Sequence, residues 1–175
     1  MRAGPSRMIR RVWRRLLALL VPLLAAAAVV LLGGRDDAPP PSQATVMRVV
    51  DGDTIVVRLA SGAEERVRYI GIDTPESVKP GTPVQCFAKE ASDANARLVE
   101  GRRVRLVRDV SERDRYGRLL AYVYRADDDL FINERLVRDG YAQAKEYRPD
   151  TRFADRLEAA MRDARAALRG LWKAC

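Results

Sequence analysis

The sequence of 175 residues contains no histidine and only two cysteines, Cys86 and Cys175. Without histidine, neither cysteine can be activated as a nucleophile by an imidazole, and the chain cannot hold zinc through imidazole ligands. Both of these classes of catalytic site are therefore excluded.

The first 34 residues predict an N-terminal hydrophobic segment that is either a signal peptide or a signal anchor. A basic cluster, "RMIRRVWRRL", leads into an apolar run over residues 16–32, "LLALLVPLLAAAAVVLL". This pattern is typical of export, and the length of the run lies between a usual signal core and a bilayer span. A buried core helix is a poor alternative because the run has no polar face. We expect the rest of the chain to be exported, either secreted or anchored in the membrane by this segment if it is not cleaved.

Residues 35–42, "RDDAPPPS", predict a proline-rich linker, so that a folded domain should occupy residues 43–175. The net charge of +8 is concentrated before that domain, because residues 1–42 hold seven arginines and two aspartates. Residues 43–175 then hold 25 basic and 22 acidic residues, a net charge of +3. Such a modest charge is consistent with an enzyme that releases its product; a protein that coats nucleic acid would usually carry a larger basic patch, although a net charge of +3 leaves room for a local one.

In an exported domain, an isolated pair of cysteines is most simply a disulfide. A bond between Cys86 and Cys175 would close a long loop, worth on the order of 4 kcal/mol in the chain-entropy model. Two unrelated thiols are the alternative.

The order of elements predicts an α+β domain. Alternating or β-branched stretches indicate strands at 45–50, 54–59, 65–72, 103–107 and 119–124. A helix is expected over residues 82–101, with Thr82 as N-cap and Pro83 at its first position, and others near 133–139 and 151–169. Five strands with about three helices fit a small closed β-barrel packed by helices.

Three stretches crowd ionisable residues: "VDGDTIVVRL" (50–59), "RVRYIGIDTPES" (66–77) and "RDRYGRLLAY" (113–122). Taken singly, they read as a hairpin turn, a turn or helix N-terminus, and a polar loop. Together they supply carboxylates for a hard divalent cation, arginines for a phosphate, and a further carboxylate to activate water. Strict strand alternation would put Arg68 and Asp73 on opposite faces, so we expect the strand to bulge or end at Gly71 if they act together.

The combination of "DGDT", then an arginine and "DTPE", then "YGR" resembles the staphylococcal nuclease (thermonuclease) family, over essentially residues 43–172. The resemblance implies an OB-type five-stranded barrel with three helices. It also implies a Ca²⁺ site made by the carboxylates of Asp53 and Asp73, the backbone carbonyl of Thr74 and waters. With so few protein ligands, calcium should bind weakly in the absence of substrate.

The resemblance further implies hydrolysis of DNA or RNA to 3′-phosphate and 5′-hydroxyl ends. Glu76 would orient or deprotonate the attacking water, and Arg68 and Arg118 would grip the phosphate and stabilise the transition state. Asp51 is expected to be structural, shaping or charging the turn beside the site.

Tyr116 and Tyr147 match family positions that contact the nucleotide, where aromatic stacking would bind single strands; surface packing is the alternative for an isolated tyrosine. The chain departs from the family in "AQAKEYRP", which has Lys145 where a tyrosine is expected and is one residue shorter. We expect a monomer whose partner is nucleic acid. The competing interpretations are a non-catalytic OB-type nucleic-acid-binding module and a structural or adhesion domain.

Overall fold

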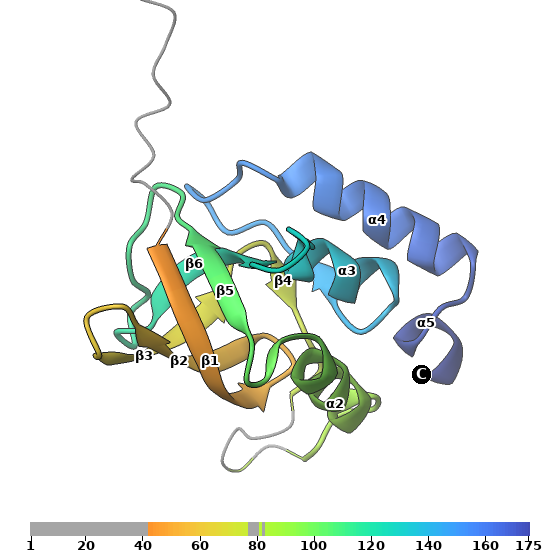
Figure 1. The fold of residues 1–175 in the computed structure, drawn as a ribbon. Coiled ribbons are helices and arrows are strands. Elements are labelled where there is room, and N and C mark those ends of the chain that lie inside the picture. Colours follow the sequence, from red (N-terminus) through yellow and green to blue (C-terminus); the bar gives the residue numbers. More distant parts are fainter. Residues whose placement is uncertain (1–41, 77–80, 82) are drawn as a thin grey trace, which may run out of the picture. The chain divides into compact units, whose positions relative to one another are not determined.

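Five strands close into a β-barrel in the order β1-β2-β3-β6-β5 (Figure 1). The structure is a computed structural model and describes residues 42–76, 81 and 83–175. The barrel strands are β1 (Ser42–Asp51), β2 (Thr54–Leu59), β3 (Glu64–Tyr69), β5 (Arg103–Val107) and β6 (Leu119–Arg125). The predicted α+β class and OB-type five-stranded barrel are therefore confirmed.

The barrel closes through one parallel pair. Strand β3 runs parallel to β6 with Val67 opposite Leu119, whereas the other neighbouring strands are antiparallel. Alternate side chains point inward, and those of Ile55, Val57 and Val104 are fully buried. The closure brings residues near position 68 next to residues near position 120, although they are far apart in the sequence.

The strand predicted at 65–72 is interrupted, as we expected if Arg68 and Asp73 act together. Strand β3 ends at Tyr69, and Gly71 adopts a left-handed φ of +77° before the short strand β4 (Ile72–Asp73). Only glycine adopts this conformation readily, and a Cβ at Gly71 would also meet Leu157 at 2.6 Å. Strand β4 pairs with the two-residue strand β7 (Gln143–Ala144), which the sequence analysis did not predict.

The predicted start of the first helix is wrong. Helix α2 (Ala88–Val99) begins several residues after Pro83, because Phe87 adopts a left-handed φ of 68° that a helix cannot contain. Residues 83–86 are not helical; they contact the "DTPE" loop and the C-terminal region instead. Thr82, the predicted N-cap, lies outside the described residues.

The remaining helices are α3 (Ile132–Arg138), α4 (Ala154–Ala166) and the single turn α5 (Leu171–Ala174), of which α5 was not predicted. Helix α3 is joined to the barrel by the buried Asn133, which donates to the Ile70 carbonyl at 2.8 Å and accepts from the Val123 amide at 2.9 Å. Helices α3 and α4 lie side by side (Figure 1). These contacts hold the segment that contains Gly71 against the helical layer.

Nothing in the described ranges is both helical and sufficiently long and apolar to cross a membrane. The predicted signal segment and nearly all of the predicted linker lie within residues 1–41, outside those ranges. The described residues belong to one compact unit, which contains all the features below.

Candidate functional site

The turn between β1 and β2 holds Asp51, Gly52 and Asp53 in a defined conformation. The Asp51 side chain accepts a hydrogen bond from the Asp53 amide at 3.0 Å, and the buried Asn95 of α2 donates to the Asp51 carbonyl at 3.2 Å. Gly52 lies against Thr74, so closely that a Cβ would come within 2.7 Å of the threonine side chain. The sequence "DGD" therefore allows the turn to contact the "DTPE" loop, and Asp51 has the contacts of a residue that shapes the turn.

Asp53 is a buried carboxylate with only 5% of its surface exposed. Its Oδ2 accepts hydrogen bonds from the backbone amide and the hydroxyl of Thr74, each at 2.9 Å, and lies 3.0 Å from a guanidinium nitrogen of Arg68. The pKa of the Asp53 carboxyl is raised to about 6, chiefly by burial and to a lesser extent by the nearby Asp51, against the opposing charge of Arg68 and the hydrogen bonds from Thr74. A second cation beside Asp53 would therefore be stabilising.

Arg68 bridges the two aspartates, because its other terminal nitrogen lies 3.0 Å from Asp73 Oδ1. The second oxygen of Asp73 accepts a hydrogen bond from Lys145 Nζ at 2.8 Å, and this bond is the main cause of a raised Lys145 pKa. The pairing of β4 with β7 brings Lys145 to this position, since its amide donates to the Gly71 carbonyl at 3.0 Å. In this structure, both oxygens of Asp73 are thus paired with cationic side chains.

One small hollow of about 190 Å³ is lined by four carboxylate side chains, those of Asp51, Asp53, Asp73 and Glu76. We call it the acidic hollow; its full lining is Asp51, Asp53, Arg68, Asp73, Thr74, Pro75, Glu76 and Arg118. Four carboxylates face two guanidinium groups there, so the hollow carries a net negative charge.

Arg118 is held by Asp114, four residues earlier in the "DRYGR" segment. The Asp114 carboxylate accepts from Arg118 Nε at 2.7 Å, from the Arg118 amide at 3.0 Å and from the Tyr116 amide at 2.9 Å. Although burial alone would raise it, these hydrogen bonds lower the pKa of Asp114 below its ordinary value. Asp114 therefore remains ionised and fixes the direction of Arg118.

A second and larger depression of about 560 Å³ adjoins the acidic hollow and shares Arg68 and Arg118 with it. We call it the arginine groove. It is lined by Arg68, Tyr69, Ile70, Ser111, Arg113, Asp114, Arg115, Tyr116, Arg118, Leu120, Tyr147, Arg148 and Asp150. Five arginines face two aspartates along this lining, so the groove is cationic.

The two predicted stacking residues, Tyr116 and Tyr147, both line the arginine groove and are 68% and 42% exposed. The guanidinium carbons of Arg115 and Arg118 lie 4.8 Å and 5.5 Å from the centre of the Tyr116 ring, and Lys145 Nζ lies 5.2 Å from that of Tyr147. Both rings are thus surrounded by positive charge and accessible to solvent.

The structure brings six of the predicted site residues together in the acidic hollow: Asp53, Arg68, Asp73, Thr74, Glu76 and Arg118. It places the two tyrosines in the neighbouring groove and joins Cys86 to Cys175 in a disulfide. Sequence reasoning missed the partners of these residues. Asp114 could have been found from its spacing of four from Arg118, whereas no local signal connects Lys145 with Asp73, 72 residues away.

Comparison with known proteins places this chain in a family. The sequence model for the family described as "Staphylococcal nuclease homologue" matches residues 66–174. The chain belongs to the staphylococcal nuclease homologue family. It is 46% identical to the thermonuclease of Staphylococcus hyicus over 127 residues, which are 73% of each protein. It is also 43% identical to the thermonuclease of Staphylococcus intermedius over 128 residues, 73% of this chain and 74% of that protein.

A third relative of this staphylococcal nuclease homologue is endonuclease YncB of Bacillus subtilis (strain 168). The two are 38% identical over 130 residues, which are 73% of this chain and 60% of the endonuclease. The similarity therefore extends to proteins from a second genus.

The donor atoms of the acidic hollow suit a hard divalent cation. Asp53 and Asp73 offer carboxylate oxygens on either side of Arg68, and the burial of Asp53 disfavours its charge in the absence of a further cation. Within the residues described, no three acidic or cysteine side chains converge closely enough to form a ready-made metal site. A cation in this nuclease homologue would therefore depend on two carboxylates, supplemented by backbone oxygen, water and substrate.

Proposed function

We propose that this chain is a calcium-dependent nuclease that hydrolyses the phosphodiester bonds of DNA, RNA or both. The observation that carries the proposal is the position of Arg68 and Arg118, which line the acidic hollow and the arginine groove at once. A phosphodiester at that boundary would have guanidinium groups on it, carboxylates on one side and cationic, aromatic surface on the other. The thermonucleases to which the chain is similar support this assignment.

The carboxylates of Asp53 and Asp73 and the backbone carbonyl of Thr74 would hold the calcium ion. When bound, calcium supplies positive charge that polarises the phosphate and stabilises the negative charge developing in hydrolysis. The buried, hydrogen-bonded setting of Asp53 fixes one of these oxygens in advance.

In the proposed reaction, Glu76 accepts a proton from the attacking water or orients that water from the edge of the hollow. Arg68 and Arg118 bind the phosphate oxygens and become most effective as the five-coordinate transition state gains negative charge. Planar guanidinium groups suit this role, and aspartates already orient both of them, Asp53 and Asp73 for Arg68 and Asp114 for Arg118. The 5′-oxygen leaves, so that the products end in 3′-phosphate and 5′-hydroxyl.

The arginine groove would bind the strand that flanks the cleaved bond. Exposed Tyr116 and Tyr147 offer faces on which bases of either DNA or RNA can stack, and the surrounding arginines compensate the backbone charge. Because stacking is tolerant of sequence, we expect a preference for single strands without strong base specificity.

We also propose that the domain acts outside the cytoplasm, anchored by residues 1–34 or released from them. The Cys86–Cys175 disulfide supports this proposal, because such bonds persist in oxidising compartments. Fractionation of cells that express the full chain would test it. Recovery of the protein in the reduced, soluble cytoplasmic fraction would contradict it.

The test of the enzymatic proposal is the hydrolysis of denatured DNA by the purified protein, with calcium and with chelator. Glu76→Gln keeps the size of the side chain but removes the proton acceptor, and we expect its kcat to fall by about 10²-fold or more. Glu146→Gln is the matched control, because Glu146 is exposed, pairs with Arg148 and does not line the acidic hollow.

The products should accept a 5′-phosphate from polynucleotide kinase directly, and their 3′ ends should be extended by polymerase only after phosphatase treatment. Tight DNA binding without cleavage under any divalent ion would overturn the proposal and favour the non-catalytic binding module.

A further inference from the structure

Gln85 forms two hydrogen bonds with the backbone of Glu76. Its side-chain oxygen accepts a hydrogen bond from the Glu76 amide at 2.8 Å, and its own amide donates to the Glu76 carbonyl at 3.0 Å. These two bonds connect the "DTPE" loop to the segment that precedes helix α2. The backbone position of Glu76 therefore depends on where Gln85 is held.

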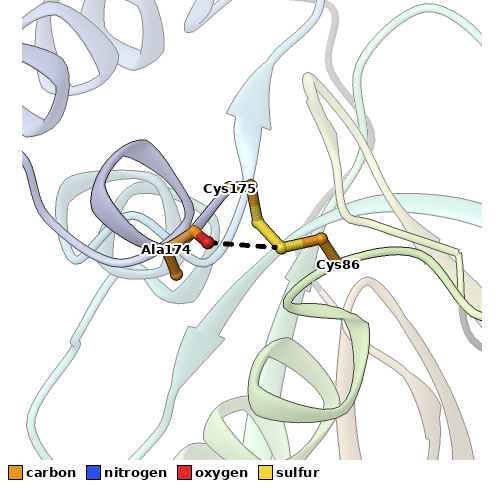
Figure 2. The surroundings of a disulfide bond; sticks show 3 residues. All are labelled: Cys86, Ala174 and Cys175. Carbon is orange, nitrogen blue, oxygen red and sulfur yellow. Dashed lines mark hydrogen bonds between the residues drawn. A yellow bond between two sulfur atoms is a disulfide. The ribbon is translucent and has the colours of Figure 1, made fainter.

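The neighbour of Gln85 is Cys86, and Figure 2 shows its disulfide to Cys175 beside Ala174 at the end of α5. The two Cα atoms are 6.0 Å apart, and the bond joins positions 89 residues apart in the sequence. A covalent bond one residue from Gln85 restricts the movement of this segment more than hydrogen bonds alone could.

The other end of the disulfide is itself fixed to the body of the domain. Leu171 of α5 is buried and donates its amide to the Gly140 carbonyl at 2.9 Å. Gly140 and Gly170 pack so closely that a Cβ on Gly140 would lie 2.2 Å from the Arg169 carbonyl oxygen. Helix α5 is thus held by the turn that follows α3.

A cavity of about 230 Å³ shows how near this assembly lies to the acidic hollow. Asp73, Thr74 and Pro75 form part of its wall, and Gln85, Cys86 and Cys175 form another part. The residues that line the acidic hollow and the residues of the disulfide are therefore separated by one small cavity.

We propose that Gln85 is a positioning residue for Glu76, and that the Cys86–Cys175 disulfide holds Gln85 in place. This inference rests on the proposed function, in which Glu76 acts on the attacking water. A general base must lie within hydrogen-bond reach of that water, and a displacement of about 1 Å can reduce the rate by about 10²-fold. Gln85 itself contacts no reacting atom in this scheme.

The first test compares two substitutions of Gln85 in the full chain. Gln85→Met keeps the shape of the side chain without its hydrogen-bond acceptor, whereas Gln85→Glu keeps an acceptor oxygen. We expect kcat to fall by about 10- to 100-fold in Gln85→Met and to recover most of that loss in Gln85→Glu. The KM for DNA and the calcium affinity measured by calorimetry should remain within about twofold of wild type. Gln143→Met is the matched control, because Gln143 lines the same cavity from β7.

A double-mutant cycle separates positioning from general damage. In a Glu76→Gln background, Gln85→Met should cause no further loss of kcat, since the group that it positions has already been removed. The paired substitution Cys86→Ser with Cys175→Ser should lower kcat in the same way, and adding Gln85→Met to it should have a smaller effect than in wild type. Equal losses in both backgrounds, or unchanged kcat in Gln85→Met, would overturn the proposal.

Hydrogen exchange tests whether Gln85 and the disulfide position Glu76, without relying on DNA cleavage. The Glu76 amide should be protected in wild type and exchange faster in Gln85→Met and in the disulfide-free variant, whereas the Tyr69 amide in β3 should be unaffected. Equal protection of the Glu76 amide in all three proteins would contradict the proposal that Gln85 and the disulfide position Glu76. If wild type failed to cleave DNA while the Glu76 amide behaved as expected, the proposed function would fail and the structural role of Gln85 would stand.

Discussion

The acidic hollow and the arginine groove share two arginines but differ in how their side chains are held. In the hollow, Asp53 is 5% exposed and has hydrogen bonds to both the backbone and the side chain of Thr74. In the groove, Tyr116 is 68% exposed and has the guanidinium groups of Arg115 and Arg118 beside its ring. Asp53 in the hollow is therefore buried and fixed by hydrogen bonds, whereas the Tyr116 ring in the groove lies at the surface.

This difference implies a division of function. Chemistry that depends on distances of about 3 Å benefits from groups that are fixed before substrate arrives. Binding of a strand of variable sequence benefits from exposed rings and guanidinium groups that can adjust. Changes in the hollow should therefore alter kcat and stability, while changes in the groove should alter KM.

Arg68→Lys should have the largest effect, because one ammonium group cannot replace a guanidinium that reaches Asp53 and Asp73 through different nitrogens. We expect kcat/KM to fall by on the order of 10³-fold, as for the loss of a transition-state donor. Steady-state kinetics on denatured DNA would measure the loss. Arg66→Lys, on the same strand but exposed, should stay near wild type; equal losses at both positions would show that the hollow is not special.

Asp53→Asn should change how stability depends on pH. The folded-state pKa of Asp53, about 6, lies above its ordinary value, so the folded protein binds a proton first as pH falls. Wild type therefore bears the full cost of the buried charge above about pH 6 and recovers it between about pH 6 and about pH 4, a change of about 3 kcal/mol.

Urea unfolding in calcium-free buffer would show this as a difference between the two proteins. The free energy of unfolding of Asp53→Asn minus that of wild type should be larger near pH 7 than near pH 4, by about 3 kcal/mol. Effects of carboxylates that do not interact with Asp53 are common to both proteins and cancel. A stability difference between the two proteins that does not depend on pH would indicate that burial does not raise the pKa of Asp53.

Tyr116→Ala tests the groove. Loss of a stacking face should weaken binding by about 1–3 kcal/mol for one base, which predicts a KM roughly tenfold higher with kcat little changed. Tyr116→Phe keeps the ring and serves as the matched control for the hydroxyl group that contacts Arg115. A fall in kcat without a change in KM would assign Tyr116 to the chemistry and break the comparison.

Lys145→Met should have the smallest effect of these substitutions. It tests a residue that contacts both regions, Asp73 in the hollow and the Tyr147 ring in the groove. Lys145 pairs with Asp73, a proposed calcium ligand, so removing its charge should strengthen calcium binding by about three- to tenfold. Calorimetric titration with calcium in the absence of nucleic acid would measure this. Lys89→Met, which removes an exposed charge from α2, should leave the affinity unchanged; weaker calcium binding in Lys145→Met would contradict the expectation.

Much of the barrel could be predicted because strand alternation is a local property. The start of α2 could not, because it is decided by the conformation of Phe87 and by long-range bonds of Gln85 and Cys86. Likewise, the two-residue strands β4 and β7 are too short to show any periodicity. Elements that depend on distant partners were therefore the ones that sequence reasoning missed or misplaced.

The candidate site shows the same limit. The break at Gly71 was expected from the odd spacing of Arg68 and Asp73 on the condition that the two residues act together. The partners that hold the site residues, such as Lys145 on Asp73 and Gln85 on Glu76, come from segments that pair only in three dimensions. Sequence identified the residues proposed for chemistry, and the structure identified those that orient them.

The parallel pairing of β3 with β6 has a consequence for the chain before it is completely folded. Arg68 and Arg118 become neighbours of one hollow only when strands some fifty positions apart close the barrel. Contacts of such long sequence separation are costly to form early in folding. A partly folded chain would therefore lack the proposed phosphate site. The cell that makes this protein would not be exposed to the proposed nuclease activity until the barrel closes.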